Sequence, residues 1–288
     1  MLELARNISE LDGVAELLEE VIVVNNASTS DYSDVRKFIT DHPYVPFRYL
    51  DAPSNLGVAK GRNYAIRQGH APILIMLDDD AELRDRDSLY RLMNAFKTAK
   101  TDRPVAIVSF KVLYHSTGEM QRNAFPHKQF EKYADLSFLE TSYYAGGAHA
   151  VTRAAIEQVG LYPEDFFYGM EEYDLSYRLI EAGYAITYSD QIVMLHKESP
   201  FGRSPHRDKI RMMWVNKCKV AWRYLPTVYF ISTALLWSFE YLRQTGGDIR
   251  GWYLGWTGIA EIPRRQQRNL IGHASMAYLK KTRARLWY

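Results

Sequence analysis

Short apolar runs alternate with segments of helical periodicity along the first two hundred residues. Residues 21–24 and 73–77 are fully apolar, and each run is followed by polar turn residues, which is typical of buried strands in a parallel sheet. Further strands are expected at residues 47–50, 105–110 and 191–195, and helices at residues 1–12, 34–40, 60–69, 89–97 and 175–182. This alternation predicts an α/β fold, with a mostly parallel sheet flanked by helices.

Polar clusters follow the two clearest strands. Asn25-Asn26-Ala27-Ser28-Thr29 comes after the first strand, and Asp78-Asp79-Asp80 comes after the strand at residues 73–77. Ligands of such sheets bind outside the carboxyl ends of the strands, so we expect both clusters to face one site.

Asp78-Asp79-Asp80 is the strongest chemical signal. Three carboxylates next to a buried run are costly unless a cation compensates them, and Mg²⁺ and Mn²⁺ prefer carboxylate oxygens. Alternation places Asp78 and Asp80 on one side of the chain and Asp79 on the other. The alternative is a solvated acidic loop, or a cluster capping the helix that begins near Leu89.

A second acidic group, Glu171, Glu172 and Asp174, opens the helix expected up to Ala182. Acids are favoured at a helix N-terminus, but capping does not need three of them in four positions. A carboxylate here that is partly desolvated beside another acid is suited to general-base catalysis. His196 ends an apolar stretch; a lone histidine is usually structural, and the acidic cluster favours metal binding.

Two glycine-containing segments offer backbone contacts to a ligand. Asn55 to Asn63 places Gly57, Gly61 and Arg62 at a helix start, which suits a phosphate, although the segment alone is a weak signal. Gly146-Gly147 would allow close approach of a ligand, and a simple bulge explains the pair equally well. Neither phosphate-loop nor dinucleotide-binding motifs occur, so those classes lose their main support.

Charge divides the chain into two parts. Residues 1–202 hold 20 Lys and Arg against 30 Asp and Glu, whereas residues 203–288 hold 16 against 4. We therefore expect a catalytic domain at 1–202 and a basic, aromatic, helical extension at 203–288. The single cysteine, Cys218, excludes a disulfide framework and a cysteine zinc cage. The N-terminus does not resemble a signal peptide, and the apolar stretch at residues 225–239 is too short for a transmembrane helix.

The extension allows two interpretations. Its aromatic residues among Arg and Lys suit a segment that lies on an anionic membrane leaflet. Alternatively, the aromatics form the core of a helical subdomain whose basic face is solvated. Nucleic-acid binding is less supported, because no motif accompanies the charge. The aromatic residues in question are Trp214, Trp222, Tyr224, Trp237, Tyr241, Trp252, Tyr253 and Trp256.

Taken together, the motifs resemble glycosyltransferase family 2, the inverting sugar transferases with a GT-A fold. The similarity runs from Glu20 to Ser199, with five motifs in the family's order. Residues 23–29, 55–63 and 78–80 resemble its nucleotide, donor and metal-binding D-x-D segments. Gly146-Gly147 and residues 171–175 resemble its acceptor loop and its E-D-x-D-L segment. The closest resemblance is to bacterial rhamnosyltransferase-type enzymes of cell-surface polysaccharide synthesis.

The resemblance implies a role for each of these residues in transferring a sugar from a nucleoside-diphosphate donor to an acceptor hydroxyl. Glu172 would be the catalytic base. Mg²⁺ or Mn²⁺ would be held by Asp78, Asp80 and His196. The donor would contact Asn25, Ser28, Asn55, Gly57, Arg62 and Asp79, and the acceptor would contact Gly146, Gly147, Glu171 and Asp174. Asp174 and Arg178 would also support the helix start or the donor. The acceptor is expected to be a glycan or a lipid-linked molecule, and the enzyme to be cytoplasmic, peripheral on the inner face of the plasma membrane, with no nucleic-acid partner.

Three departures from the family pattern stand out. Asn25 replaces the usual Asp, and Glu172 is one methylene longer than the usual base. The family also begins with a strand that would precede residue 1, so we expect the natural protein to start upstream. An in-frame stop codon just before Met1 would contradict that expectation.

Two other functions fit parts of this pattern. A nucleotidyltransferase on a similar sheet would release pyrophosphate rather than a nucleoside diphosphate. An inactive sugar- or nucleotide-binding relative would be consistent with Asn25 and the absent strand, although the acids at 78–80 and 171–174 argue for catalysis.

Overall fold

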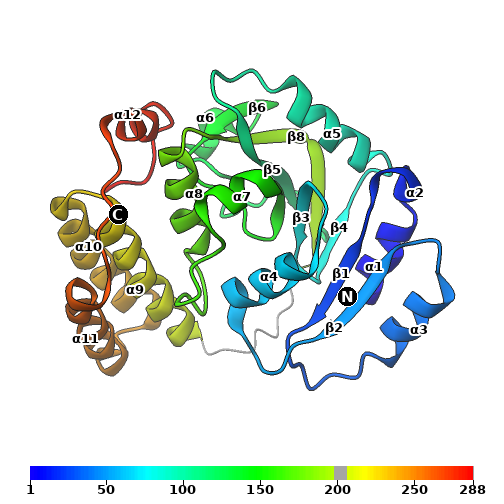
Figure 1. Ribbon diagram of the computed structural model, residues 1–288. Coiled ribbons are helices and arrows are strands. Elements are labelled where there is room, and N and C mark those ends of the chain that lie inside the picture. The colour runs from blue at the N-terminus through cyan, green and yellow to red at the C-terminus, as the bar shows by residue number, and fades with distance from the viewer. Residues whose placement is uncertain (198–205, 288) are drawn as a thin grey trace.

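The computed structural model describes residues 1–197 and 206–287 and has the α/β architecture expected from the sequence (Figure 1). Its strands are β1 (Val21–Asn25), β2 (Phe47–Asp51), β3 (Ile73–Leu77), β4 (Ala81–Leu83), β5 (Val105–Tyr114), β6 (Phe138–Thr141), β7 (Ala148–Thr152) and β8 (Ala185–His196). Its helices are α1 (Leu2–Ser9), α2 (Val14–Leu17), α3 (Ser33–Asp41), α4 (Gly57–Gln68), α5 (Ser88–Thr98), α6 (Phe130–Tyr133), α7 (Arg153–Val159), α8 (Glu171–Glu181), α9 (His206–Tyr224), α10 (Thr227–Thr245), α11 (Ile249–Arg265) and α12 (His273–Lys281).

The strands form two sheets. The larger has the order β3-β7-β5-β8-β4, with β6 also paired to β8, and the smaller is the parallel pair β1-β2. Strands β3 and β5 both pair antiparallel with β7, and β8 pairs parallel with β5, so β3, β5 and β8 run in the same direction. The short strands β4 and β6 and the inserted β7 run against them and were not expected from the sequence.

Helices cover both faces of the larger sheet, which explains why nearly every side chain of β5 is buried. Ile107 belongs to the core that includes Leu175 of α8, whereas its neighbour Val108 belongs to the core that includes Leu89 of α5. Successive strand residues point to opposite faces, so one strand contributes to both cores. Continuous apolar runs are the expected sequence signature of such a strand.

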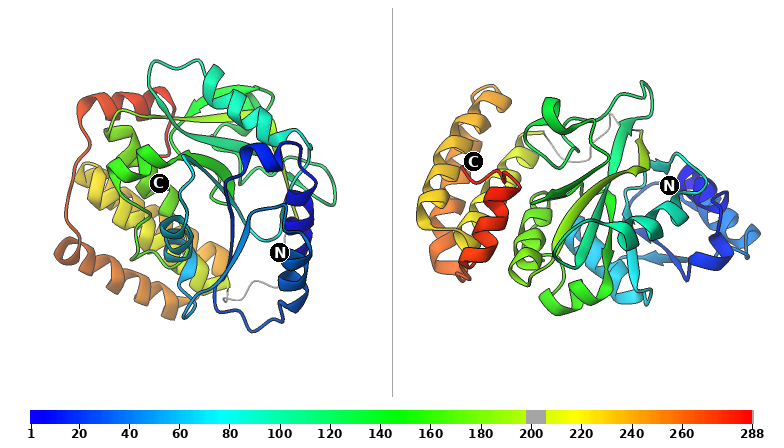
Figure 2. Two further views of the ribbon diagram at one scale, coloured as in Figure 1. Left: turned by 45° about the vertical axis from the view of Figure 1, so that its right-hand side comes forward. Right: turned by 90° about the horizontal axis from the view of Figure 1, so that it is seen from above.

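The extension is a layer of helices beside α8 (Figures 1 and 2). Helix α9 packs against α8, and α10 and α11 pack against α9. Trp214 of α9 is fully buried, and Gly255 of α11 gives it room, since a Cβ there would lie 2.2 Å from the indole ring. The expected domain boundary at residue 202 falls outside the described residues.

The structure favours the subdomain interpretation for most of the aromatic residues of the extension. Trp214, Tyr224, Trp237 and Tyr241 are buried, and Tyr253 is exposed. Trp222, Trp252 and Trp256 pack partly buried against the same core. Among the described residues, no helix is both long enough and apolar enough to cross a membrane.

Candidate active site

Arg62 of α4 joins three of the acidic residues singled out in the sequence. Its guanidinium lies 3.0 Å from Glu171 Oε1, 3.6 Å from Glu172 Oε1 and 3.4 Å from Asp78 Oδ1. Burial alone would lower the pKa of Arg62, but the surrounding carboxylates raise it overall. The arginine therefore holds the end of β3 and the N-terminus of α8 together as one charged site.

Glu172 stands in the first turn of α8 with its side chain 18% exposed. Burial, and next the charge of Glu171, raise the pKa of Glu172 to about 8, although Arg62 opposes that shift. A carboxylate with a pKa this close to neutrality is suited to accept a proton. The role of Glu172 as the base stays a prediction.

The paired glycines make room for the carboxylates. A Cβ on Gly146 would lie within 2.0 Å of Glu172 Oε1, and one on Gly147 would lie within 2.2 Å of Asp78 Oδ2. Any side chain at either position would displace an acidic group. The pair therefore allows the loop to pass close to Glu172 and Asp78, and its expected contact with a ligand stays a prediction.

Asp80 and His196 form the second part of the site. Strands β4 and β8 pair Ala81 with His196, which brings His196 Nε2 to 3.4 Å from Asp80 Oδ1. His196 Nδ1 lies 3.1 Å from Gln121 Oε1. When Nδ1–H donates to that oxygen, the Nε2 lone pair points toward Asp80, which is the tautomer that a metal-ligating histidine needs.

The expected metal set is divided in the structure. Asp78 lies beside Arg62 and Gly147, whereas Asp80 lies beside His196. Within residues 1–197 and 206–287, no three His, Cys, Asp or Glu side chains come together to hold an ion. Of the expected metal ligands, Asp80 and His196 lie beside each other, and Asp78 as a third ligand stays a prediction.

The expected nucleoside contacts lie at the ends of β1 and β2. Asn25 Oδ1 accepts from the Ser28 N–H at 2.9 Å, and Asn25 Nδ2 donates to Asp51 Oδ1 at 3.0 Å. Hydrogen bonds from Arg36 and then Asn25 lower the pKa of Asp51. A carboxylate thus lies next to Asn25. Sequence analysis missed this residue, Asp51, although it directly follows the strand expected at residues 47–50.

Asn55 and Gly57 use their polar groups inside the loop before α4. Asn55 Oδ1 accepts from the Gly57 N–H at 3.0 Å, and Asn26 donates to the Gly57 carbonyl at 3.2 Å. Gly57 has a φ of +71° and packs against Phe167, where a Cβ would lie 2.5 Å from the carbonyl oxygen. The contacts seen here are structural, and a donor role for Asn55, Gly57 and the exposed Asp79 stays a prediction.

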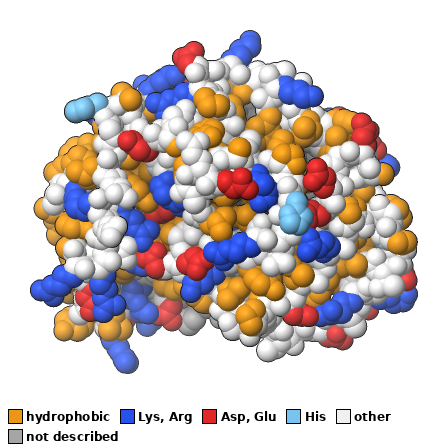
Figure 3. Space-filling model, viewed as in Figure 1, with side chains coloured by type: hydrophobic (Ala, Val, Ile, Leu, Met, Phe, Trp, Pro, Cys, Tyr) orange, Lys and Arg blue, Asp and Glu red, His pale blue; other side chains and the backbone are white. Residues whose placement is uncertain are grey.

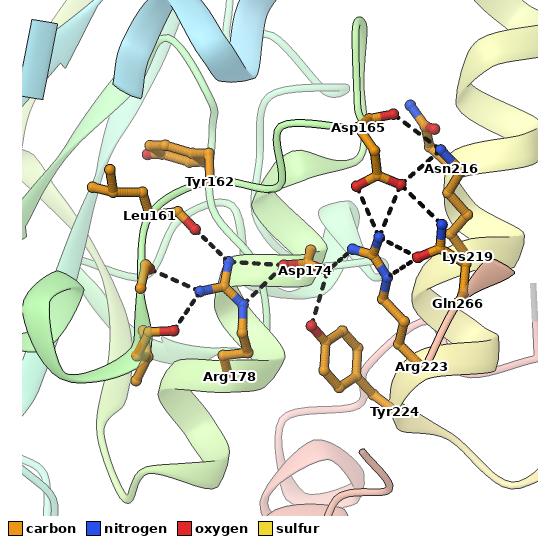
Figure 4. A network of polar contacts seen from close by, with 12 residues as sticks. Leu161, Tyr162, Asp165, Asp174, Arg178, Asn216, Lys219, Arg223, Tyr224 and Gln266 are labelled. Atoms are coloured by element: carbon orange, nitrogen blue, oxygen red, sulfur yellow. Dashed lines mark hydrogen bonds and ion pairs between the residues drawn. The ribbon is translucent and has the colours of Figure 1, made fainter. Parts of the chain in front are cut away.

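Asp174, which was expected to contact the acceptor, is bound by residues of α8 and α9. Its side chain is 2% exposed, Arg178 donates to Oδ2, and Arg223 and Tyr224 donate to Oδ1 (Figure 4). Arg223 also pairs with Asp165, and Arg178 donates to the backbone carbonyls of residues 159–161. Asp174 therefore fastens α8 to α9. Glu171 is also 2% exposed and pairs with Arg62. Acceptor contacts by Glu171 and Asp174 stay a prediction.

A buried group that the sequence did not reveal supports Arg62 and the glycine loop. His149 bonds the Ala145 carbonyl through Nδ1 and the Tyr162 hydroxyl through Nε2, at 3.0 and 2.9 Å. Burial lowers the pKa of His149 to about 3, which keeps the ring neutral. Asn63 binds both backbone groups of Tyr162. A lone histidine inside a weak strand pattern gave no signal of this role.

We expect Gly147→Ala to lower donor affinity and transfer at least about tenfold while the protein stays folded, because the new Cβ displaces the short Asp78 side chain. Gly61→Ala is the matched control, since the nearest atom to a Cβ there is 3.5 Å away and alanine favours the helix. Steady-state kinetics with circular dichroism would check both variants. Equal kinetics for the two would contradict the role assigned to Gly147.

Comparison with known proteins assigns the chain to a family. The family model for Glycosyl transferase family 2 matches residues 4–160, and the chain belongs to that family. An "Uncharacterized protein" of Haemophilus influenzae is 28% identical over 51% of this chain and 77% of its own length. The "Uncharacterized glycosyltransferase YfnE" of Bacillus subtilis is 26% identical, and the match covers 63% of this chain and 57% of that protein.

Solved structures share the fold at low sequence identity. GalNAc-T7 with UDP, GalNAc and Mn²⁺ has a TM-score of 0.59 at 14% identity, covering 93% of this chain and 52% of its own. S. aureus TarS residues 1–349 with UDP also has a TM-score of 0.59 at 14% identity, and the match covers 90% of this chain and 76% of that one. The mannosyltransferase PcManGT of Pyrobaculum calidifontis, with GDP-Man and Mn²⁺, has a TM-score of 0.52 at 19% identity. The match covers 98% of this chain and 78% of that one. The expected GT-A fold and glycosyltransferase class are thus confirmed.

Proposed function

We propose that this protein is a metal-dependent, inverting glycosyltransferase that moves a sugar from a nucleoside-diphosphate donor to a hydroxyl group. The observation that carries the proposal is Arg62, which places the base candidate Glu172 in the same charged site as Asp78. UDP or GDP-Man is present in the similar solved structures, which supports a nucleotide-sugar donor.

Glu172 would take the proton of the acceptor hydroxyl as its oxygen bonds to the anomeric carbon. The bond from that carbon to the diphosphate oxygen breaks in the same displacement, and the diphosphate leaves with the electron pair. A single displacement inverts the anomeric configuration. The raised pKa of Glu172 matches a base that must hold the proton once it is transferred.

Asp80 and His196 fit a divalent ion. Mg²⁺ in transferase sites commonly uses one or two carboxylates and completes its coordination with substrate phosphates and water. A carboxylate beside an imidazole suits Mn²⁺ as well, and Mn²⁺ is present with the nucleotide or sugar in two of the similar structures. When bound, the ion would neutralise the diphosphate as it leaves.

Asn25, Ser28 and Asp51 would contact the nucleoside, because they lie together at the carboxyl ends of β1 and β2. The acceptor would be a glycan or a lipid-linked molecule in cell-surface polysaccharide synthesis, and rhamnose is the candidate sugar. These details rest on the sequence resemblance. The enzyme would then work in the cytoplasm, peripherally on the inner membrane surface.

Titration calorimetry with UDP, dTDP and GDP, each with and without Mn²⁺, tests the donor site directly. We expect one nucleotide to bind in a metal-dependent manner. Asp80→Ala should weaken the binding of that nucleotide at least about tenfold, because the ion loses one of its two protein ligands. Glu10→Ala, a change at an exposed carboxylate, is the control. Failure of all three nucleotides to bind would contradict the proposal.

We also expect chelation of divalent ions to abolish sugar transfer, and added Mn²⁺ or Mg²⁺ to restore it. The product separates this function from the alternative that sequence analysis left open. A transferase of the proposed kind releases a nucleoside diphosphate, whereas a nucleotidyltransferase releases pyrophosphate. Phosphorus NMR of the reaction distinguishes them, and full activity in the chelator would overturn the metal requirement.

A further inference from the structure

Helix α10 carries an apolar stripe on the side that faces away from the rest of the protein. Val228, Ile231, Leu235 and Phe239 are all exposed, with spacings of three, four and four residues that align them on one face. Phe239 is 68% exposed, and leaving so much of an aromatic side chain in contact with water is unfavourable in free energy. Residues on the opposite side of the helix, Trp237 and Tyr241 among them, are buried, so α10 is apolar on both sides.

More exposed apolar side chains lie on α10 and on the neighbouring helix α11. Leu236 adjoins the stripe on α10, and Ile249 and Tyr253, both more than 60% exposed, follow on α11 after the turn at Gly246 and Gly247. We call Val228, Ile231, Leu235, Leu236, Phe239, Ile249 and Tyr253 the outer apolar face. Singly exposed hydrophobic residues are ordinary, whereas a set gathered on two neighbouring helices is typical of a surface that meets a partner.

The two helices that carry this face also carry exposed arginines. Arg250 and Arg264 are exposed on α11. Arg243 of α10 and Arg265 of α11 are also exposed, but their charges are offset by ion pairs with Glu240 and Glu261. Figure 3 shows hydrophobic side chains gathered at the edge of the molecule that α10 occupies in Figure 1, with Lys and Arg side chains below them. The extension as a whole carries 16 basic against 4 acidic residues, and the rest of the chain carries 20 against 30.

We propose that the outer apolar face docks this glycosyltransferase onto the surface of a bilayer that contains anionic lipid. The apolar side chains would enter the boundary between headgroups and acyl chains, and the arginines would bind lipid phosphates. No described helix can cross the membrane, so the contact is interfacial. The proposal rests on the proposed function in one respect, because it names the surface that would present a lipid-linked acceptor.

Charge separates a bilayer from the other occupant that an apolar face suggests, a second copy of the chain. Pairing two copies through this face would bring two strongly basic extensions together, which like-charge repulsion opposes. An anionic bilayer attracts the same surface and repels the acidic remainder of the chain. The helices α10 and α11 form the outermost layer at one end of the molecule, so the contact would leave the site on α8 uncovered (Figure 2).

Co-sedimentation of the full chain with vesicles tests the proposal without any need for catalysis. We expect binding to vesicles of phosphatidylcholine and phosphatidylglycerol, and weaker binding to phosphatidylcholine alone. Raising NaCl from 0.1 M to 1 M shortens the screening length from about 10 to about 3 Å. This should remove most of the electrostatic contribution to vesicle binding. Leu235→Asp/Phe239→Asp should lower binding at least about tenfold.

Tyr44→Asp/Leu136→Asp is the matched control, since it adds the same two charges at exposed apolar residues outside the extension and should bind as the unmodified protein does. Arg250→Gln and Arg264→Gln leave the apolar face intact, and each should weaken binding to anionic vesicles by about fivefold, from about 1 kcal/mol per charge. These two variants keep the test valid if circular dichroism shows that the aspartate variant is misfolded.

Absence of the unmodified protein from both vesicle pellets would overturn the proposal, as would equal binding by the aspartate variant and its control. A dimer in light scattering that Leu235→Asp/Phe239→Asp dissociates would assign the face to a second copy instead. Nucleotide binding is measured separately by calorimetry, so failure of membrane docking and failure of the proposed transfer reaction remain distinguishable.

Discussion

Glu172→Gln is expected to lower the rate of sugar transfer by about a thousandfold while leaving donor affinity unchanged. The amide keeps the shape of the side chain but cannot take the acceptor proton. Glu181→Gln, at the other end of α8, is the matched control. Rate measurements at saturating donor, combined with calorimetry, would check both variants. A fully active Glu172→Gln variant would exclude Glu172 as the base.

The pH dependence of the reaction follows from the same residue. Glu172 works as a base only when it is deprotonated, and its pKa is raised to about 8 by burial and by Glu171. We therefore expect kcat/KM to rise with pH through a midpoint near 8 and to level off above it. A profile that is flat across this range would show that another group takes the proton.

Stability should change with pH in the opposite sense. A carboxyl whose pKa is higher in the folded than in the unfolded protein binds its proton more tightly when folded. Its contribution to stability is complete below the unfolded value of about 4.5 and is lost as pH rises through the folded value. Glu172→Gln should accordingly raise Tm relative to the unmodified protein above pH 8, which thermal unfolding at two pH values would measure.

Asp174→Ala is expected to lower the free energy of unfolding by about 3–5 kcal/mol, because it leaves Arg178 and Arg223 without their shared buried carboxylate. Urea denaturation would measure the loss. Glu10→Ala, which removes an exposed carboxylate, should change stability by no more than about 0.5 kcal/mol. A loss below about 1 kcal/mol at Asp174 would show that the network in Figure 4 contributes little.

A double-mutant cycle separates this ion pair from its surroundings. Asp174→Ala and Arg178→Ala are expected to lose less together than the sum of their single effects, with a coupling of about 0.5–3 kcal/mol. The reason is that either single variant already removes the contact between Asp174 and Arg178, so the double variant cannot lose it a second time. Arg223 and Tyr224 still bind Asp174 when Arg178 is replaced. Additive losses would show that the two residues act independently.

The sequence was informative wherever an element follows from local pattern. The apolar runs at residues 21–24 and 73–77 became β1 and β3, and the polar residues after them lie at the strand ends as expected. Strand β7 was missed because Ala148 to Thr152 contains small residues and a histidine instead of an apolar run. Only its neighbours β3 and β5 fix it in the sheet.

The candidate site was predictable in its residue types and not in its pairings. Arg62 contacts Asp78, 16 positions away, and Glu171, 109 positions away, and no local spacing reveals such contacts. Asp174 and Glu171 have the same chemistry as Glu172, yet burial gives them structural partners. The structure also places most aromatic residues of the extension in a core. The sequence left this open, because hydrophobicity alone does not say which side of a helix faces a core.

The attachment of α8 to α9 has a consequence for how related chains can vary. Arg223 of the extension binds both Asp174 and Asp165. Asn216 of α9 donates to the carbonyls of Tyr168 and Gly169, just ahead of α8. The extension is therefore not an interchangeable module. We expect positions 165, 174, 178 and 223 to covary among homologues. A chimaera that takes its C-terminal helices from a relative should fold only when all four residues are transferred as a set.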